Sequence, residues 1–295
     1  VLSSGEYKEL LAEAKANNPT AAYEPGYGSE TDWYDVLFRN GVTTQHDLSF
    51  SGGTAKTKFY VSGSYFNEKP IMIANQTQRF TSRINLDQNI NKSIDLFFRM
   101  GSSYNINNMF NPGDSYYTNR PIDGPYNTDG SFIVKPFNVL AEAELNDDVQ
   151  KTMAMYANVG GTVKIIPGLT YTTTNGIDFL STNEVEYSSM YTHSGSINSD
   201  GGGSAYRGST SNLGWNSQHR FNYEKEFGKN SLSFLLGGEA MDKSRRSVSS
   251  SGWGFANDKI REVSYAVNER GDSNASEQSA LSYYGQAKYS WDKKY

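Results

Sequence analysis

The sequence predicts an all-β fold, a partial transmembrane antiparallel β-barrel of about nine strands preceded by a short helix. Three observations lead to this fold class. Apolar and polar residues alternate over many stretches; in 93–105, one parity carries Ile94, Leu96, Phe98 and Met100. The connections between these stretches alternate between short and long. No apolar run approaches the ~18 residues that a membrane-spanning helix needs.

The composition agrees with strands that have one apolar and one wet face. Of 295 residues, 36% are hydrophobic and 20% are charged, and the mean hydropathy is −0.65. A membrane barrel tolerates such values because only every second residue faces lipid. The net charge is −5 and basic residues are not clustered, which argues against nucleic acid as a partner. Cysteine is absent, so disulfides and thiolate metal sites are excluded.

Residues 1–45 are predicted to form a loop segment that contains a helix. Ser3 is the expected N-cap, and Glu6 stands three residues later, which is the spacing of a capping box. The sequence Asn-Asn-Pro at 17–19 is expected to end this helix. A second short helical turn is expected within 31–38, capped by Thr31 or Asp32.

Residues 46–295 are predicted to form barrel strands, because here the pattern has a period of two. Many of the alternating stretches have about ten residues or more, as a tilted membrane strand requires. We expect strands within 45–53, 56–66, 79–87, 93–105, 151–165, 168–179, 212–224, 231–240 and 280–291.

The connections between these strands separate into two classes by length. Tight ones are expected at 52–56, 88–92, 166–168 and 227–230. Longer ones are expected at 67–78 and near 106–150, 189–211 and 242–278. Compact soluble domains rarely carry several structureless loops longer than ~15 residues, whereas outer-membrane barrels have short turns at one end and long loops at the other.

The two parities predict two environments for the two faces of the wall. A charge on the lipid face near mid-membrane costs ~2–4 kcal/mol, so we assign the charged parity to the barrel interior. Members of that parity are Arg83, Asp95, Arg99, Asn158, Lys164, Arg220 and Lys288. Thr173, Asn175 and His219 break the rule on the apolar parity. Either their strands rise above the membrane there, or a bulge shifts the register.

No motif indicates covalent chemistry, so we expect no enzyme activity, no catalytic residues, no metal site and no cofactor. The three histidines lie far apart, and no nucleophile motif is present. Asp147 and Asp148 resemble a glycosidase pair, but a solvated loop explains them better. The sequence Asn-Thr-Asp-Gly at 127–130 lacks the other ligand positions of a calcium loop, and we expect a tight turn in a small hairpin.

The stretch from Thr31 to Asn91 resembles the start of the barrel in SusC/RagA-type TonB-dependent outer-membrane transporters. The matching pieces, in family order, are TDWYD, FRNG, HDLSFSGG, KTKFYVSGSYFNE and RFTSRINLD. The earlier piece GEYKELLAEA resembles the helical segment of the first extracellular loop in that family. One departure is Pro70, where the family more often has glycine, and we expect it to reshape one outer loop.

The resemblance implies that this chain is an internal fragment. Family barrels have ~22 strands around a plug domain, so the chain is expected to hold strands two to ten and to lack the plug. The apolar face is then expected to contact lipid. The long connections near 106–150, 189–211 and 242–278, together with residues 1–45, are expected to be extracellular.

The resemblance also implies an activity, a location and partners. Family members reside in the outer membrane of Gram-negative bacteria and import oligosaccharides or peptides. A SusD-like surface lipoprotein closes over the barrel as a lid, and the TonB complex supplies energy through the plug region, which is missing here. The expected partners are therefore this lipoprotein, the TonB complex, outer-membrane lipid and the substrate.

The loop at 111–132 is the expected place of substrate contact, because its aromatic rings could stack on sugars and its polar groups could bind hydroxyls. The candidate residues are Tyr116, Tyr117, Asn119, Asp123, Tyr126 and Phe132. In the alternative interpretation these aromatic residues pack the loop against itself or against the lid protein.

Two other function classes stay open. One is a passive porin or a structural outer-membrane barrel, which would lack a plug and a TonB-contacting segment. The other is a soluble β-rich carbohydrate-binding module, because soluble sandwiches also alternate. Recovery from aqueous buffer without detergent would favour the soluble module.

Overall fold

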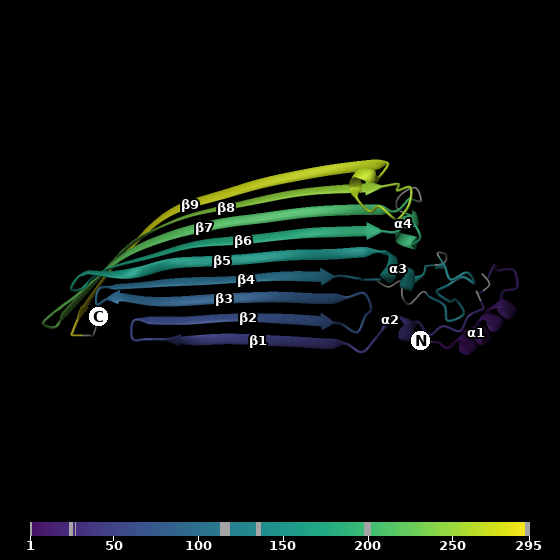
Figure 1. Cartoon of the computed structure of the whole chain (residues 1–295), viewed down its shortest axis with the longest axis horizontal. Helices are drawn as coiled ribbons and strands as arrows, with labels where there is room; N and C mark the ends of the chain where they lie inside the picture. Colours follow the sequence, from purple (N-terminus) through teal and green to yellow (C-terminus); the bar gives the residue numbers. More distant parts are fainter. Residues whose placement is uncertain are drawn as a thin grey trace.

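The computed structural model describes residues 2–23, 26, 28–112, 119–133, 137–197 and 202–292. These residues form one antiparallel sheet of nine strands in sequence order, in which each strand pairs with its neighbours in the chain (Figure 1). The strands are β1 Val42–Gly53, β2 Thr57–Lys69, β3 Gln76–Asn91, β4 Ile94–Asn108, β5 Asp147–Ile166, β6 Leu169–Ser188, β7 Ser204–Phe227, β8 Asn230–Trp253 and β9 Asn268–Trp291. The predicted fold class, an open wall of antiparallel strands, is confirmed.

The sheet curves, and its strands become longer along the chain. β1 has 12 residues and β9 has 24. In Figure 1 the helices all gather at one end of the strands, while the short turns lie at the other end. The segregation of short and long connections that the sequence predicted is therefore present.

Two of the long connections are shorter than predicted, because the strands beside them extend further. The connection predicted at 242–278 spans only 254–267, since Trp253 of β8 still pairs with Asn268 of β9. The connection predicted at 189–211 ends where β7 begins, at Ser204. In these extensions both parities are polar, so alternation disappears although the backbone hydrogen bonds continue.

The helices form where the sequence places their caps. α1 spans Ser4–Asn17 with a complete capping box between Ser3 and Glu6, as predicted. α2 spans Trp33–Leu37, and the carboxylate of Asp32 caps it. The remaining helical elements are α3 Val139–Leu145, α4 His193–Ile197 and the 3-10 helix η2 Val263–Tyr265. No helix among the described residues combines the length and the apolar character needed to cross a membrane.

The register places the apolar parity of every strand on one face. Phe50 of β1 is paired with Val61, which is paired with Ile84 of β3, and Ile84 with Met100 of β4. Residues paired directly in an antiparallel ladder point to the same side. This apolar face is open: Leu48 is 63% exposed and Leu236 is 64% exposed.

The buried core lies in the layer of connections at the helical end, not under the sheet. One cluster joins Trp33 and Leu37 of α2 to Val139 and Leu140 of α3. A second cluster joins Tyr187 and Ala205, at the ends of β6 and β7, to Phe255 and Val263. Each fully buried aliphatic side chain contributes roughly 1.5–3 kcal/mol, so these clusters fix the connections to the strands.

Candidate functional site

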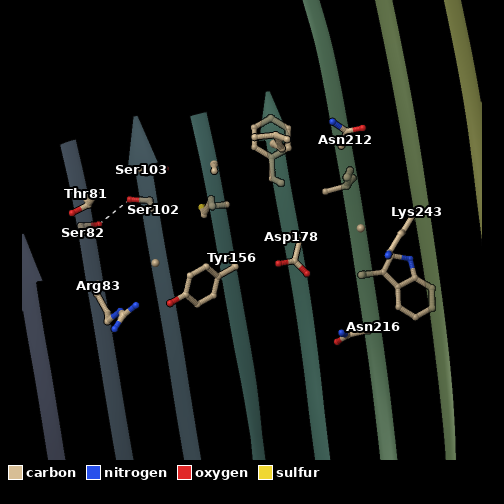
Figure 2. A pocket seen from close by; sticks show the side chains of 18 of the residues that line it. Thr81, Ser82, Arg83, Ser102, Ser103, Tyr156, Asp178, Asn212, Asn216 and Lys243 are labelled. Atoms are coloured by element: carbon tan, nitrogen blue, oxygen red, sulfur yellow. Dashed lines mark hydrogen bonds between the residues drawn. The ribbon is translucent and has the colours of Figure 1, made fainter. Parts of the chain in front are cut away.

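The polar face of the sheet is concave and forms a hollow of about 1320 Å³. Residues from all nine strands line it, and most of its side chains are hydroxyls, carboxamides and charged groups. Figure 2 shows Arg83 on β3, Tyr156 on β5, Asp178 on β6, Asn216 on β7 and Lys243 on β8, along the hollow. Such a surface accommodates a polar, hydrated neighbour.

Tyr156 lies across a glycine in the middle of this hollow. Gly101 of β4 is paired with Tyr156 of β5, and a methyl group on Gly101 would lie 2.5 Å from the tyrosine ring. The absence of a side chain at Gly101 therefore lets the ring lie flat over β4. Its hydroxyl points toward Arg83 of β3 (Figure 2), while Asp178 of β6 is its paired neighbour on the other side.

A second glycine separates two asparagines on the same face of the sheet, one of which, Asn216, lines the hollow. Gly176 of β6 lies between Asn158 of β5 and Asn216 of β7. A methyl group on Gly176 would lie 2.6 Å from the Oδ1 atom of each asparagine. Among the described residues, Asn216 Oδ1 is a buried acceptor that receives no hydrogen bond. Buried acceptors without a hydrogen bond are uncommon. Because both asparagine oxygens lie close to Gly176, a larger residue at this position would have to displace them.

The outer loop that carries the candidate substrate contacts is built around an ion pair. Arg120 donates from Nε and Nη2 to the two carboxylate oxygens of Asp123 at 2.7 and 3.0 Å. This contact raises the pKa of Arg120. The indole of Trp33 donates to the carbonyl of Arg120 at 3.0 Å. Asp123 is buried, and its carboxylate holds the loop in shape.

Residues 126–132 form the small hairpin that the sequence predicted. Tyr126 and Phe132 are bridged, and their ring centroids lie 5.0 Å apart. The turn closes with Gly130 donating its N–H to the carbonyl of Asn127, and Gly130 has φ +84°, which favours glycine. Hydrogen bonds from Ser131 lower the pKa of Asp129. The sequence Asn-Thr-Asp-Gly is thus a turn.

The six predicted contact residues have different environments. Tyr126 is 47% exposed, whereas Phe132 packs against the buried cluster of Trp33 and Leu140. Asn119 is partly buried. Tyr116 and Tyr117 lie outside the described residues. The structure brings Asp123, Tyr126 and Phe132 into one loop layer, in which Tyr126 presents the most open surface of the three.

Comparison with known sequences relates the chain to bacterial receptors named TonB-dependent receptors. It is 28% identical over 303 residues to TonB-dependent receptor P3 of Formosa agariphila, covering 93% of this chain and 29% of the relative. It is 24% identical over 304 residues to TonB-dependent receptor SusC of Bacteroides thetaiotaomicron, covering 89% of this chain and 29% of SusC. The chain therefore spans less than a third of either relative. No family model matches the sequence.

Comparison with solved structures gives the same fold. The structure of the RagAB peptide transporter matches with a TM-score of 0.74 at 18% identity, covering 98% of this chain and 36% of the matched chain. The nine strands and their outer connections therefore have the arrangement of the RagAB barrel wall. The chain is therefore similar in sequence to TonB-dependent receptors that include SusC, and similar in fold to the RagAB peptide transporter.

One polar network lies on the apolar face of the sheet. Tyr171 and Ser217 each hydrogen-bond one ring nitrogen of His219, at 2.6 and 3.0 Å. Ser217 also donates to Asn175 Oδ1 at 2.6 Å, and Asn175 donates to Thr173 Oγ1 at 3.1 Å. Each of the three exceptional residues thus has a polar partner, which lowers the cost of placing it on this face.

The register of β6 and β7 runs without interruption from Leu169↔Tyr223 to Ser188↔Ser204. A bulge as the cause of the exceptional residues is therefore wrong. The sequence did mark these positions, because they break the alternation. It gave no signal for the contacts of Asp258, which lies in the connection 254–267: a lone aspartate in a polar loop has no distinguishing pattern.

Proposed function

We propose that this chain forms part of the barrel wall of an outer-membrane importer that takes up oligosaccharides or peptides. One observation carries the proposal: a curved sheet that has an open apolar face on its convex side and a charged, hydroxyl-rich face on its concave side. A soluble sandwich would cover its apolar face with a second layer, whereas a membrane barrel turns that face to lipid. The location proposed is the outer membrane of a Gram-negative bacterium.

The resemblance supports an energised importer over a passive pore. The relatives carry TonB-dependent receptor in their names, and the structural match is called a peptide transporter. We propose that the complete receptor contacts the TonB complex and that a SusD-like surface lipoprotein covers its outer end. The outer connections and α1 would then be extracellular and lie beneath this lipoprotein.

We propose that the outer loop 111–132 contacts the substrate. Tyr126 presents an exposed ring beside Phe132, which suits stacking against a sugar or a peptide side chain. Tyr116 and Tyr117, which lie outside the described residues, stay candidates for substrate contact from the sequence. Asn119, Asp123 and Phe132 would contribute mainly by holding the loop in shape, because Asp123 is buried in its pair with Arg120.

The test is uptake by cells that carry the full-length receptor. Labelled oligosaccharides and labelled peptides would be offered separately, with and without a functional TonB complex. We expect uptake of one of the two classes, and we expect it to stop when TonB or the proton gradient is removed. Uptake that continues without TonB would identify a passive porin instead.

A variant sharpens the proposal for the loop. Tyr126→Ala is expected to raise the substrate concentration for half-maximal uptake roughly tenfold, because a stacked aromatic contact contributes about 0.5–1.5 kcal/mol beyond its buried area. Tyr34→Ala is the matched control, since Tyr34 of α2 is an exposed outer tyrosine whose ring lies beside a phenylalanine, Phe38, as that of Tyr126 lies beside Phe132. Equal effects of the two variants would contradict a specific role for Tyr126.

A further inference from the structure

The connection between β8 and β9, residues 254–267, folds back over the outer ends of β6 and β7; we name it the strap. Asp258 anchors it. Its carboxylate accepts hydrogen bonds from Tyr187 Oη at 2.7 Å, from Ser189 Oγ and from the backbone N–H of Met190 at 3.2 Å. The carboxylate of Asp258 therefore accepts from three donors in residues 187–190, at and just after the end of β6. Tyr187 and Ser189 are both almost fully buried.

Arg261 makes a second attachment. Its guanidinium donates to Asp147 Oδ2 at 2.6 Å, at the start of β5, and lies 4.6 Å from the ring centroid of Tyr187. Arg207 of β7 donates to the carbonyl of Arg261 at 2.8 Å. The strap is thus joined to β5, β6 and β7 by charged groups, each of which has a partner.

The inner side of the strap is apolar and closely packed. Phe255 and Val263 are buried against Tyr187 and Ala205. A methyl group on Gly252 would lie 2.7 Å from Ala266 Cβ, so the strap approaches the β8 backbone directly. Its outer side is open: Ile260, Tyr265 and Val267 are all exposed. Among the described residues, the contacts that hold the strap lie on its inner side.

A polar chain continues from the strap anchor to α3 through residues 189–194, which we name the hub. The backbone N–H of Ser189 donates to Asn146 Oδ1 at 2.8 Å. Ser194 donates from its backbone N–H and its hydroxyl to Glu142 of α3, at 3.1 and 2.6 Å. Glu142 and Ser189 are buried, so water does not readily replace these bonds.

The same chain reaches the candidate substrate loop. Asn138 caps α3 and donates from Nδ2 to the carbonyls of Pro125 and Ile133, at 2.7 and 3.0 Å. These two carbonyls flank the hairpin of Tyr126 and Phe132. A continuous series of side chain–backbone contacts therefore links the hairpin, α3, the hub and the strap.

We propose that the strap is a releasable latch whose closed state is coupled, through the hub and α3, to the loop that contacts the substrate. When one hydrogen bond of a buried polar network breaks, the remaining hydrogen bonds become weaker. The strap is therefore expected to open as a unit. The coupling is reciprocal, because a change that favours one conformation of the loop must favour the matching state of the strap. The latch rests on the contacts above, and only its link to substrate rests on the proposed function.

The test is limited trypsin cleavage of the full-length receptor in detergent, followed by mass spectrometry of the cut sites. Lys259 and Arg261 lie in the strap, and cleavage there requires the strap to lift and unfold locally. Asp258→Asn is expected to raise the cleavage rate in the strap at least tenfold, because hydrogen bonds to a charged carboxylate are stronger than those to a neutral carboxamide. Asp272→Asn, on β9 and outside the strap, is the matched control and is expected to leave the rate unchanged.

Glu142→Gln tests the coupling at a distance. It removes the charge that binds Ser194 but touches no strap residue, and we expect it to raise strap cleavage several-fold. Each variant would be checked by far-UV circular dichroism, so that a misfolded protein is recognised. An unchanged rate in Asp258→Asn would overturn the latch, and an unchanged rate in Glu142→Gln would overturn the coupling.

Hydrogen exchange of the unaltered receptor provides a measurement that needs no variant. The backbone N–H of Met190 in the hub and that of Phe255 in the strap are both hydrogen-bonded. If they open together, their protection is expected to agree within about threefold; protection that differs more than a hundredfold would overturn the latch. These readouts do not need transport, so a failure of uptake with an intact latch would count against the proposed function alone.

Discussion

The strand wall and the outer connections are held together in opposite ways. The wall is held by nine strands of backbone pairing, and large side chains on its apolar face are exposed, such as Phe50 and Leu236. The outer connections are held by buried side chains, in the clusters around Trp33 and Tyr187. Single side chains therefore decide the structure of the outer end, whereas the wall depends on backbone pairing and on the alternation of apolar and polar residues.

The largest expected effect is the loss of stability of the outer connections when Trp33 is truncated. Trp33→Ala removes a buried indole and its hydrogen bond to the carbonyl of Arg120, and such truncations cost about 3–5 kcal/mol. We expect the outer connections to lose hydrogen-exchange protection while the strands keep theirs. Leu236→Ala, on the open face of β8, is the control and should change protection little in detergent. Equal loss of protection in both variants would contradict the statement that buried side chains stabilise the outer connections more than the wall.

A variant of Asp123 tests whether a buried ion pair stabilises the outer connections as a buried apolar side chain does. Asp123→Asn removes the charge that binds Arg120 in two places, and we expect a loss of about 2–3 kcal/mol in local stability. Protection of residues 119–133 against hydrogen exchange is the measurement. Lysine at position 120 would retain the charge but not the two-point geometry, so Arg120→Lys should recover only part of the loss of Arg120→Ala.

Gly176 shows where the wall itself depends on one position. Gly176→Ala places a methyl group 2.6 Å from two asparagine oxygens, and overpacking of this kind costs about 1–3 kcal/mol. Gly63→Ala is the control, because the nearest atom to its new methyl group lies 3.8 Å away. The urea concentration at half-unfolding is expected to fall in the first variant only. A fall of equal size in both would mean that glycine matters here for flexibility and not for space.

The smallest expected effect concerns the capping box of α1. Ser3→Ala removes the hydroxyl that accepts from the N–H of Glu6 at 3.3 Å, and losing an N-cap costs about 1 kcal/mol. We expect the first turn of α1 to exchange its amide hydrogens faster, with no change in the strands. Ser3→Asp should restore the protection, since aspartate is an equally good N-cap.

The wall was predictable from sequence because a sheet with one apolar and one polar face imposes a period of two on the side chains. The rule stops where both faces are wet: residues 242–253 carry lysine, arginine and serine on both parities, and β8 nevertheless continues to Trp253. The caps at Ser3 and Asp32 were predictable because their partners lie within three residues.

The outer end was less predictable because its contacts join distant parts of the chain. Asp123 was selected as a candidate for substrate contact, but its burial depends on Trp33 and Arg120, and Trp33 lies 90 residues away. Asp258 was not selected at all, since its partners Tyr187 and Ser189 lie about 70 residues away. The break in alternation at His219 was visible, but the hydrogen bonds that stabilise it were not.

The most direct test of the central claim is to measure which parity of the wall touches lipid. Residues 1–295 contain no cysteine. Once any cysteine elsewhere in the full-length receptor is replaced, single cysteines at 82 to 86 of β3 can each carry a nitroxide label in receptor reconstituted in liposomes. Oxygen, which concentrates in lipid, should reach labels at 82, 84 and 86 more readily than labels at 83 and 85. No alternation, or alternation of the opposite phase, would contradict the claim that the apolar parity of the wall faces lipid.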